Sequence, residues 1–393
     1  DNYRQTHYQL FFDTKFNDNL VFNTAVFYTK GKGYYEQYKA DEKYSKYNLP
    51  NPVFGSNTLT NSDFISQLWL DNDFYGNIFS LQYKKDNTQF TAGGAVTNYE
   101  GNHFGKLIWA SNGLPDPEHK WYDLDASKTD INTYAKWQQK IVQHWSTFLD
   151  AQFRNVQYSI TGFRDNPTLV INTAYDFFNP KAGLSYNRNG WNAYISYSIG
   201  NKEPNRDDFE AGTAQLPRPE QLKDLEIGIE KRKAKYNWSV TGYYMNYKNQ
   251  LVLTGKINDA GAYTRTNIPK SYRMGAELQA AATIVKWLKI EGNLTISRNK
   301  VKNFSEYIDD YDLGVQKTNS YLLPDIAFSP AVIAGSTISL LPVKNTEINL
   351  IGKYVSKQYL DNTQNENRKL NSFYTQDTRI AYTFKKAFIK EAA

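Results

Sequence analysis

Long runs in which apolar and polar side chains alternate dominate this sequence. Three clear runs are HYQLFFDTKF (residues 7–16), WNAYISYSIG (191–200) and LKIEGNLTISR (288–298). In the first run, one face of an extended chain carries Tyr8, Leu10, Phe12, Thr14 and Phe16. The opposite face is mostly polar. A period of two predicts β-strands, here in a sheet whose two faces meet different surroundings.

The connections between these runs alternate in length. Short polar turns are expected at 17–19, 85–87, 142–144, 187–190, 233–235 and 341–345. Longer segments are expected between them, at 29–73, 100–127, 162–175, 201–221, 254–262, 302–327 and 359–371. This alternation is typical of an up-and-down antiparallel barrel with one trimmed end, and it predicts about 15 strands. Most of them reach the roughly 9 to 11 residues that a tilted membrane strand needs.

Composition favours a membrane surface over an ordinary soluble core. The chain has 31 Tyr, 22 Phe and 8 Trp among its 393 residues, yet its mean hydropathy is −0.67. Tyr and Trp suit a boundary where one end of the ring is apolar and the other is wet. The three apolar rows carry no charge, as a lipid-facing row requires. A soluble β-sandwich also buries a charge-free face, but its strands are usually shorter.

Several other classes of function find no support in the sequence. There is no Cys, and 46 basic residues against 40 acidic residues give an evenly spread net charge of +6, without the basic patch of a nucleic-acid binder. The histidines His7, His103, His119 and His144 have no metal-ligand spacing. Neither a G-x-S-x-G nor a Walker motif occurs. We therefore expect no enzyme activity, resident cofactor, metal site or nucleic-acid partner.

Four segments carry motifs in an order that resembles TonB-dependent outer-membrane receptors. They are SYSIGNKEPNRDDF (196–209), RPEQLKDLEIGIE (218–230), YYMNYKNQLVL (243–253) and TNIPKSYRMGAELQ (266–279). The residues at the family's motif positions are Pro219, Glu220, Glu226, Gly228, Asn267, Gly275 and Glu277. WLDNDFYG (69–76) and YEGNHFG (99–105) also resemble the family. Each motif is weak alone, and their joint order over nearly the whole chain carries the resemblance.

The resemblance implies an all-β, transmembrane antiparallel barrel of about 22 strands. In the family, an N-terminal plug domain with a TonB box closes this barrel. Residues 1–393 show no plug, TonB box or family-type final strands. We therefore expect one barrel domain over 1–393 that lacks the plug, about five first strands and about two last strands of such a barrel.

The function implied by the resemblance is active uptake across the outer membrane of a Gram-negative bacterium. The TonB-ExbB-ExbD complex would supply the energy through the plug, and a ferric siderophore or similar metal chelate is the default cargo. Outer-membrane lipid, lipopolysaccharide and a surface lipoprotein are the other expected partners. Cobalamin or glycan import and a porin-like passive channel stay open as alternatives, and a soluble β-sheet binding protein is a third.

The candidate ligand residues are expected in the long outer loops. They are His103, His119, Trp121, Tyr122, Arg164 and Arg206. LPDPEHKWYD (114–123) is alternatively a Pro-stiffened loop that packs on its neighbours. NKEPNRDDF (201–209) either lines a vestibule or forms a salt-bridge cluster at the loop base through Glu203, Arg206, Asp207 and Asp208.

Two charged segments and one hairpin complete the expectations. EYIDDYDLG (306–314) is either a solvated outer loop or a Ca²⁺ site formed by Asp309, Asp310 and Asp312. The basic turn Lys231, Arg232, Lys233 and Lys235 is expected to be solvated near lipid headgroups. In its hairpin, we expect Leu225, Ile227, Ile229, Trp238 and Val240 to face lipid, and Glu226, Gly228 and Glu230 to face inward. Gly242, Tyr243 and Tyr244 mark either a bulge or an aromatic girdle.

Overall fold

The computed structural model describes residues 2–116, 118–210, 216–257, 263–386 and 389–392. Fifteen strands form one antiparallel sheet, in the order β1-β2-β5-β6-β7-β8-β9-β10-β11-β12-β13-β14-β17-β18-β21. Each strand therefore pairs with its neighbours along the chain, apart from small hairpins inserted in the connections. The prediction of an up-and-down antiparallel sheet of about 15 strands is confirmed.

The main strands are long. Their bounds are β1 (Asn2–Asn17), β2 (Leu20–Lys43), β5 (Asn61–Lys85), β6 (Thr88–Ala110), β7 (Lys120–Val142), β8 (Trp145–Phe163), β9 (Asn166–Arg188), β10 (Trp191–Lys202), β11 (Glu220–Arg232), β12 (Tyr236–Ile257), β13 (Tyr263–Val285), β14 (Leu288–Lys302), β17 (Val332–Leu340), β18 (Thr346–Val355) and β21 (Phe373–Tyr382). The shorter elements are η1 (Tyr44–Tyr47), β3 (Val53–Phe54), β4 (Asn57–Thr58), α1 (Arg206–Phe209), β15 (Phe304–Asp310), β16 (Val315–Tyr321), β19 (Gln358–Tyr359), β20 (Lys369–Leu370), β22 (Phe384–Lys386) and β23 (Ile389–Ala392).

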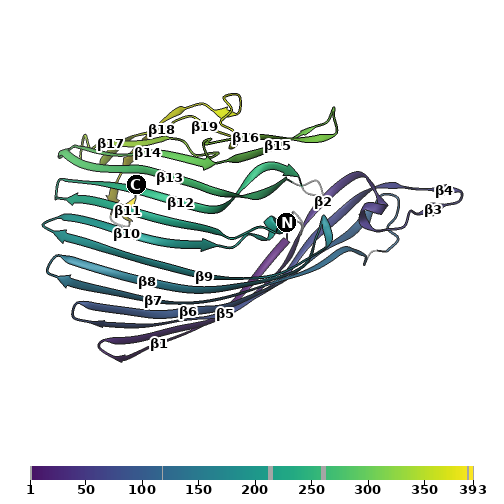
Figure 1. The fold of residues 1–393 in the computed structure, drawn as a ribbon, viewed down its shortest axis with the longest axis horizontal. Coiled ribbons are helices and arrows are strands. Elements are labelled where there is room, and N and C mark those ends of the chain that lie inside the picture. Colours follow the sequence, from purple (N-terminus) through teal and green to yellow (C-terminus); the bar gives the residue numbers. More distant parts are fainter. Residues whose placement is uncertain (1, 117, 211–215, 258–262, 387–388, 393) are drawn as a thin grey trace.

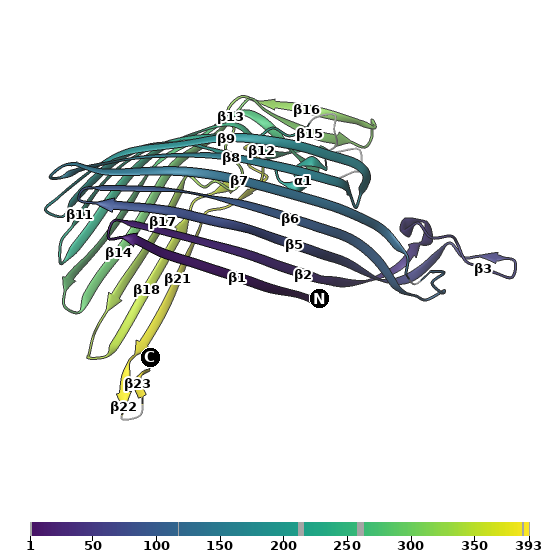
Figure 2. The ribbon, with the colours of Figure 1, turned by 90° about the horizontal axis from the view of Figure 1, so that it is seen from below.

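The sheet is strongly curved but open (Figures 1 and 2). Strands β1 and β21 are its two edges, and no described residue of one pairs with the other. The short turns gather at the left end in Figure 1, and the elaborated connections leave from the right. In the described residues, no helix has the length and apolarity needed to cross a membrane.

The short turns lie where the sequence predicted them, but several predicted loops are largely strand. A further short turn at Lys286–Trp287 was not expected. The prediction of a long loop at 162–175 is wrong. Strand β8 runs to Phe163 and β9 begins at Asn166, so a tight turn joins them. Likewise, much of 29–73 and 100–127 belongs to β2, β5, β6 and β7. Ladder hydrogen bonds depend on the backbone, so they continue where the apolar alternation has stopped.

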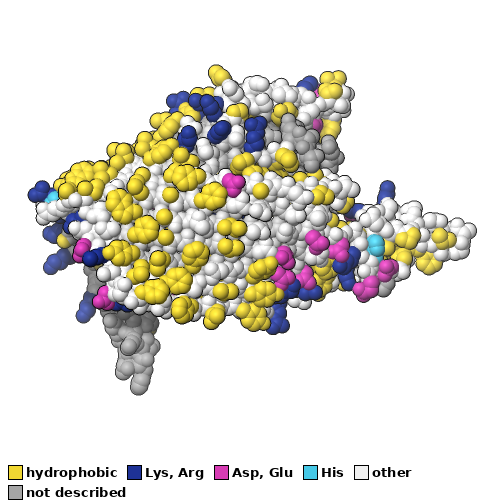
Figure 3. Space-filling model, turned by 60° about the horizontal axis from the view of Figure 1, so that its bottom comes forward, with side chains coloured by type: hydrophobic (Ala, Val, Ile, Leu, Met, Phe, Trp, Pro, Cys, Tyr) yellow, Lys and Arg dark blue, Asp and Glu magenta, His cyan; other side chains and the backbone are white. Residues whose placement is uncertain are grey.

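The two faces of the sheet differ as the alternation predicted. Leu10 and Ile227 on the outward face are 72% and 60% exposed, and apolar side chains spread over this face in Figure 3. The pairing of β11 with β12 has no register shift, and it places Ile227 opposite Gly242 and Leu225 opposite Tyr244. The bulge at Gly242 is therefore excluded: Tyr244 continues the outward row, and Tyr243 faces inward.

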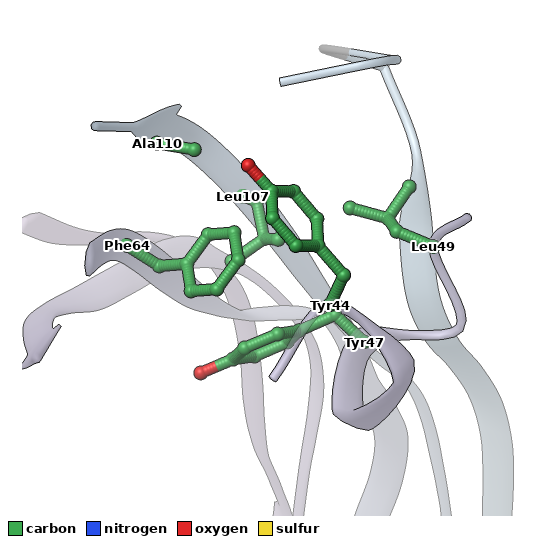
Figure 4. Packing of buried hydrophobic residues seen from close by; sticks show 6 residues of the cluster. All are labelled: Tyr44, Tyr47, Leu49, Phe64, Leu107 and Ala110. Carbon is green, nitrogen blue, oxygen red and sulfur yellow. The ribbon is translucent and has the colours of Figure 1, made fainter. Parts of the chain in front are cut away.

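Buried apolar residues form small clusters beneath the connections at the elaborated end. The first cluster joins the loop after β2 to β5 and β6, and consists of Tyr44, Tyr47, Leu49, Phe64, Leu107 and Ala110 (Figure 4). A second lies under the β8–β9 turn and α1, with Phe163 and Phe209 fully buried. A third packs around Val301 and Phe304. The core therefore fixes the loops, while the strands between form a thin shell.

Candidate functional site

A hollow of about 710 Å³ lies near the elaborated end of β1, β2, β5, β6 and β7. The β8–β9 turn and the segment containing α1 also contribute to its lining. Its lining includes four of the predicted ligand residues, namely His103, Tyr122, Arg164 and Arg206. It also includes Tyr3, Tyr35 and Glu210, which the sequence analysis did not select. Aromatic rings and two guanidinium groups therefore meet in one concave site.

His103 and Tyr122 come from neighbouring strands. His103 on β6 pairs with Leu124 on β7, and Tyr122 follows the first two residues of β7. Both residues lie nearer the elaborated end than the apolar part of the outward face does. On β6, that face is already polar at Asn98 and Glu100. Burial and the nearby Arg206 charge lower the pKa of His103, so its imidazole is neutral at neutral pH. Burial raises the pKa of Tyr122 to about 12, so this phenol stays protonated.

The two arginines are held by the connections above the hollow. Arg164 pairs weakly with Asp165, with Nε and Oδ1 3.4 Å apart. Arg206 is the first residue of α1, and its guanidinium lies 4.7 Å from the centre of the Phe163 ring. The Nε atom of Arg206 is buried and has no hydrogen-bond partner in the described part of the chain. Burial, with Asp165 nearby, raises the pKa of Glu210. The guanidinium groups of Arg164 and Arg206 favour an anionic ligand.

His119 and Trp121 do not enter the hollow. The Nε2 atom of His119 lies 2.7 Å from the backbone oxygen of Tyr47. The Trp121 ring is 5.1 Å from the Tyr47 ring, edge to face, and it packs against the first buried cluster. Both residues therefore hold their loop against its neighbours, which is the alternative considered for 114–123. Pro117 of that segment lies outside the described residues.

Glu203 anchors the connection that carries Arg206. Its carboxylate oxygens lie 2.8 Å from Lys128 Nζ and 2.8 Å from Arg154 Nη1, and Arg154 also binds Asp130. Although burial opposes ionisation, these cations lower the pKa of Glu203 to about 2. The predicted internal cluster of Glu203, Arg206, Asp207 and Asp208 is wrong: among the described residues no ion pair joins these four. Glu203 pairs with Lys128 and Arg154, and Asp208 pairs with Arg265, so the cations come from the barrel wall. Arg206 instead lines the hollow.

The remaining charged segments have structural partners. In 306–314, Asp310 pairs with Lys317 and accepts backbone hydrogen bonds from the hairpin turn, so the segment forms the β15–β16 hairpin. Among the described residues, no three His, Asp or Glu side chains are placed to hold a metal. The prediction of a solvated basic turn is wrong for Lys231. This side chain is only 8% exposed and lies over the Trp191 ring.

The motif residues fix the strands around the hairpin of β11 and β12. The Asn267 side chain bonds the backbone N–H and carbonyl of Arg218, beside Pro219. Glu220 accepts a hydrogen bond of 2.7 Å from the Leu251 N–H. At Gly228, an added Cβ would lie 2.2 Å from the Tyr194 ring. A Cβ at Gly275 would lie 2.5 Å from the Ile296 carbonyl oxygen and 2.7 Å from the Tyr243 hydroxyl.

Glu226 and Glu277 also belong to these motifs. In the pairing of β11, β12 and β13, Glu226 lies opposite Tyr243 and Glu277 lies opposite Thr241. Both carboxylates line one hollow on the inner face, together with Arg273. The motif positions thus serve strand packing and inner-face polarity.

Comparisons with known proteins agree with this architecture. A family model described as "TonB dependent receptor-like, beta-barrel" matches residues 1–390. No curated protein sequence matches the chain. The siderophore receptor PiuA from Acinetobacter baumannii is 15% identical with a TM-score of 0.69, and the match covers 98% of this chain and 58% of that one.

Two further solved structures are similar. The ferric citrate transporter FecA is 15% identical with a TM-score of 0.69, over 98% of this chain and 55% of that one. The copper transporter OprC is 13% identical with a TM-score of 0.69, over 97% and 57%. This chain thus spans less than two thirds of each relative, and such identities show the fold alone. Because the family model covers nearly the whole chain, the chain belongs to the TonB-dependent receptor β-barrel family.

Proposed function

We propose that this chain forms the barrel wall of an outer-membrane receptor that imports a ferric siderophore or a similar metal chelate. The TonB-ExbB-ExbD complex would drive import through a plug domain, in the outer membrane of a Gram-negative bacterium. The family assignment supports the transport class. Similar structures described as siderophore, ferric citrate and copper transporters support a metal chelate as cargo.

The observation that carries the proposal is the pair of arginines in the hollow. Arg164 and Arg206 line an aromatic cavity of about 710 Å³, a volume within the range of small-molecule sites. Their guanidinium groups suit carboxylate or catecholate oxygens, and the tyrosine rings suit the body of an organic chelator. A neutral His103 adds a polar group without another charge.

Uptake by cells that carry the full-length receptor tests this proposal. We expect Arg164→Gln with Arg206→Gln to weaken binding of an anionic ferric chelate at least about tenfold, because each charge-assisted hydrogen bond contributes roughly 1.5–3 kcal/mol. The matched control is Arg298→Gln, which removes an exposed arginine from β14, away from the hollow.

The measurements are the chelate Kd of the purified receptor and uptake of radiolabelled iron by cells with and without TonB. Equal affinity in the double variant and the control would remove the hollow as the binding site. Uptake that continues without TonB would show a passive channel. If the receptor bound cobalamin or a glycan and did not bind the ferric chelate, the proposed cargo would be wrong.

A further inference from the structure

The segment that carries Arg206 is anchored to the barrel wall on both sides of this residue. Before it, Glu203 pairs with cations of β7 and β8. After it, the Oδ1 atom of Asp208 lies 2.7 Å from the Nε atom of Arg265 on β13. In the sheet, β9, β10, β11 and β12 separate β8 from β13. The segment with α1 therefore bridges wall strands that are not neighbours in the sheet.

Asp208 is the buried anchor of α1. Its side chain is only 3% exposed, and it is not one of the described residues that line the hollow. Its Oδ2 atom accepts a hydrogen bond of 2.7 Å from the backbone N–H of Asn205, the residue before the helix. The next residue, Phe209, is 1% exposed and packs in the second buried cluster. Asp208 and Phe209 together fix how α1 is rotated against the wall.

This rotation determines where Arg206 points. Residues two positions apart on a helix do not face each other, so the anchor at Asp208 leaves Arg206 on another side of α1. There its guanidinium lies 4.7 Å from the centre of the Phe163 ring and contributes to the lining of the hollow. Within the described residues, no hydrogen bond at Nε fixes this guanidinium. Its place therefore depends on the orientation of α1.

We propose that Asp208 is a positioning residue for anion recognition: paired with Arg265, it orients α1 so that Arg206 presents its guanidinium to a ligand in the hollow. This inference rests on the proposed function, which supplies the anionic chelate. Its sign is opposite to that of charge alone. Asp208→Asn removes a negative charge near the hollow, which by Coulomb attraction would strengthen anion binding. A loss of affinity would therefore come from misplacement of Arg206.

Binding of a hexadentate ferric tris-catecholate, which is a trianion, to the purified full-length receptor tests this role. The test variant is Asp208→Asn. The matched control is Asp207→Asn, which makes the same chemical change at the neighbouring exposed residue of α1. Both substitutions are also made in an Arg206→Gln background. Fast migration of unheated samples on gels checks that each variant is folded.

We expect Asp208→Asn to weaken chelate binding about tenfold, which corresponds to the loss of one charge-assisted hydrogen bond, and Asp207→Asn to leave it unchanged. In the Arg206→Gln background, Asp208→Asn should have no further effect, because it acts through Arg206. The proposal would be overturned by wild-type affinity in Asp208→Asn, by an equal loss in Asp207→Asn, or by the same loss with and without Arg206.

A second measurement needs no chelate. Phenylglyoxal modifies guanidinium groups, and mass spectrometry of peptides gives the rate at Arg206. We expect Asp208→Asn and Arg265→Gln each to raise this rate several-fold, because a guanidinium released from the Phe163 ring is more accessible to the reagent. An unchanged rate would overturn the positioning role. If Arg206→Gln itself left chelate affinity unchanged, the proposed function would fail, whereas the modification rate would still support or overturn the positioning of Arg206 by Asp208.

Discussion

Glu203 shows how one buried carboxylate can control a loop above the hollow. Lys128 and Arg154 hold its pKa at about 2, below the value of about 4.3 expected in an unfolded chain. The ionised form therefore stabilises the loop above pH ~4.3, and this stabilisation disappears as the pH falls towards 2. The linked free energy is roughly 3 kcal/mol.

Glu203→Gln should reproduce the acid effect at neutral pH. We expect the free energy of local opening of residues 203–210 to fall by roughly 3 kcal/mol. Hydrogen exchange of this segment, corrected for the intrinsic effect of pH, measures the change. The wild type should approach the variant as the solution is acidified from pH ~4.3 to ~2. Asp207→Asn, at an exposed site on α1, is the control; an equal effect there would exclude the Glu203 ion pairs as the cause.

Strand geometry and strand pairing decide which aromatic side chains line the hollow. Tyr122 faces the hollow while Trp121 packs on Tyr47, because successive residues of an extended chain face opposite ways. Residue type alone suggested both as ligand contacts. Tyr3 was missed, because only the pairing of β1 with β2, which sets Tyr3 opposite Gly33, brings it to the site.

At the scale of elements, turn chemistry was easier to predict than strand ends. The turn between β9 and β10 places Asn189 at φ 51° and Gly190 at φ 76°, the left-handed conformation that an Asn-Gly pair adopts readily. At the β8–β9 end, apolar residues lie on both faces, with Leu169 and Ile171 buried and Val170 exposed. The period-two signal therefore disappears while the ladder continues. This is the reason that 162–175 was predicted as a loop.

Gly190→Ala should destabilise its hairpin. The residue would keep a left-handed backbone, and its Cβ would lie 2.3 Å from the Arg232 carbonyl oxygen. We expect a cost of at least about 1–2 kcal/mol. The measurement is the temperature at which the folded receptor loses its fast migration on gels. Gly200→Ala in β10, the strand that follows this turn, meets no atom within 4 Å and should leave that temperature unchanged; an equal loss in both variants would contradict the argument.

At the scale of the whole molecule, the contrast between the two faces makes the barrel a membrane structure. Ile227 points outward and Glu226 points to the polar inner face. Ile227→Arg should cost roughly 2–4 kcal/mol in a bilayer, because the charge would face hydrocarbon. Glu226→Arg introduces the same side chain one residue away and should cost much less. Urea unfolding in lipid vesicles measures both; equal costs would contradict the lipid assignment of the outward face.

The sequence by itself determined the class of fold, the sidedness of the strands and the short turns. These depend on local rules: side chains alternate every residue, and turn residues act over a few positions. Only the tertiary structure decided which side chains meet. Arg164, Arg206 and Tyr122 converge, His119 turns away and Glu203 reaches Arg154, because strand register and curvature bring together residues far apart in the chain, and no local pattern encodes that.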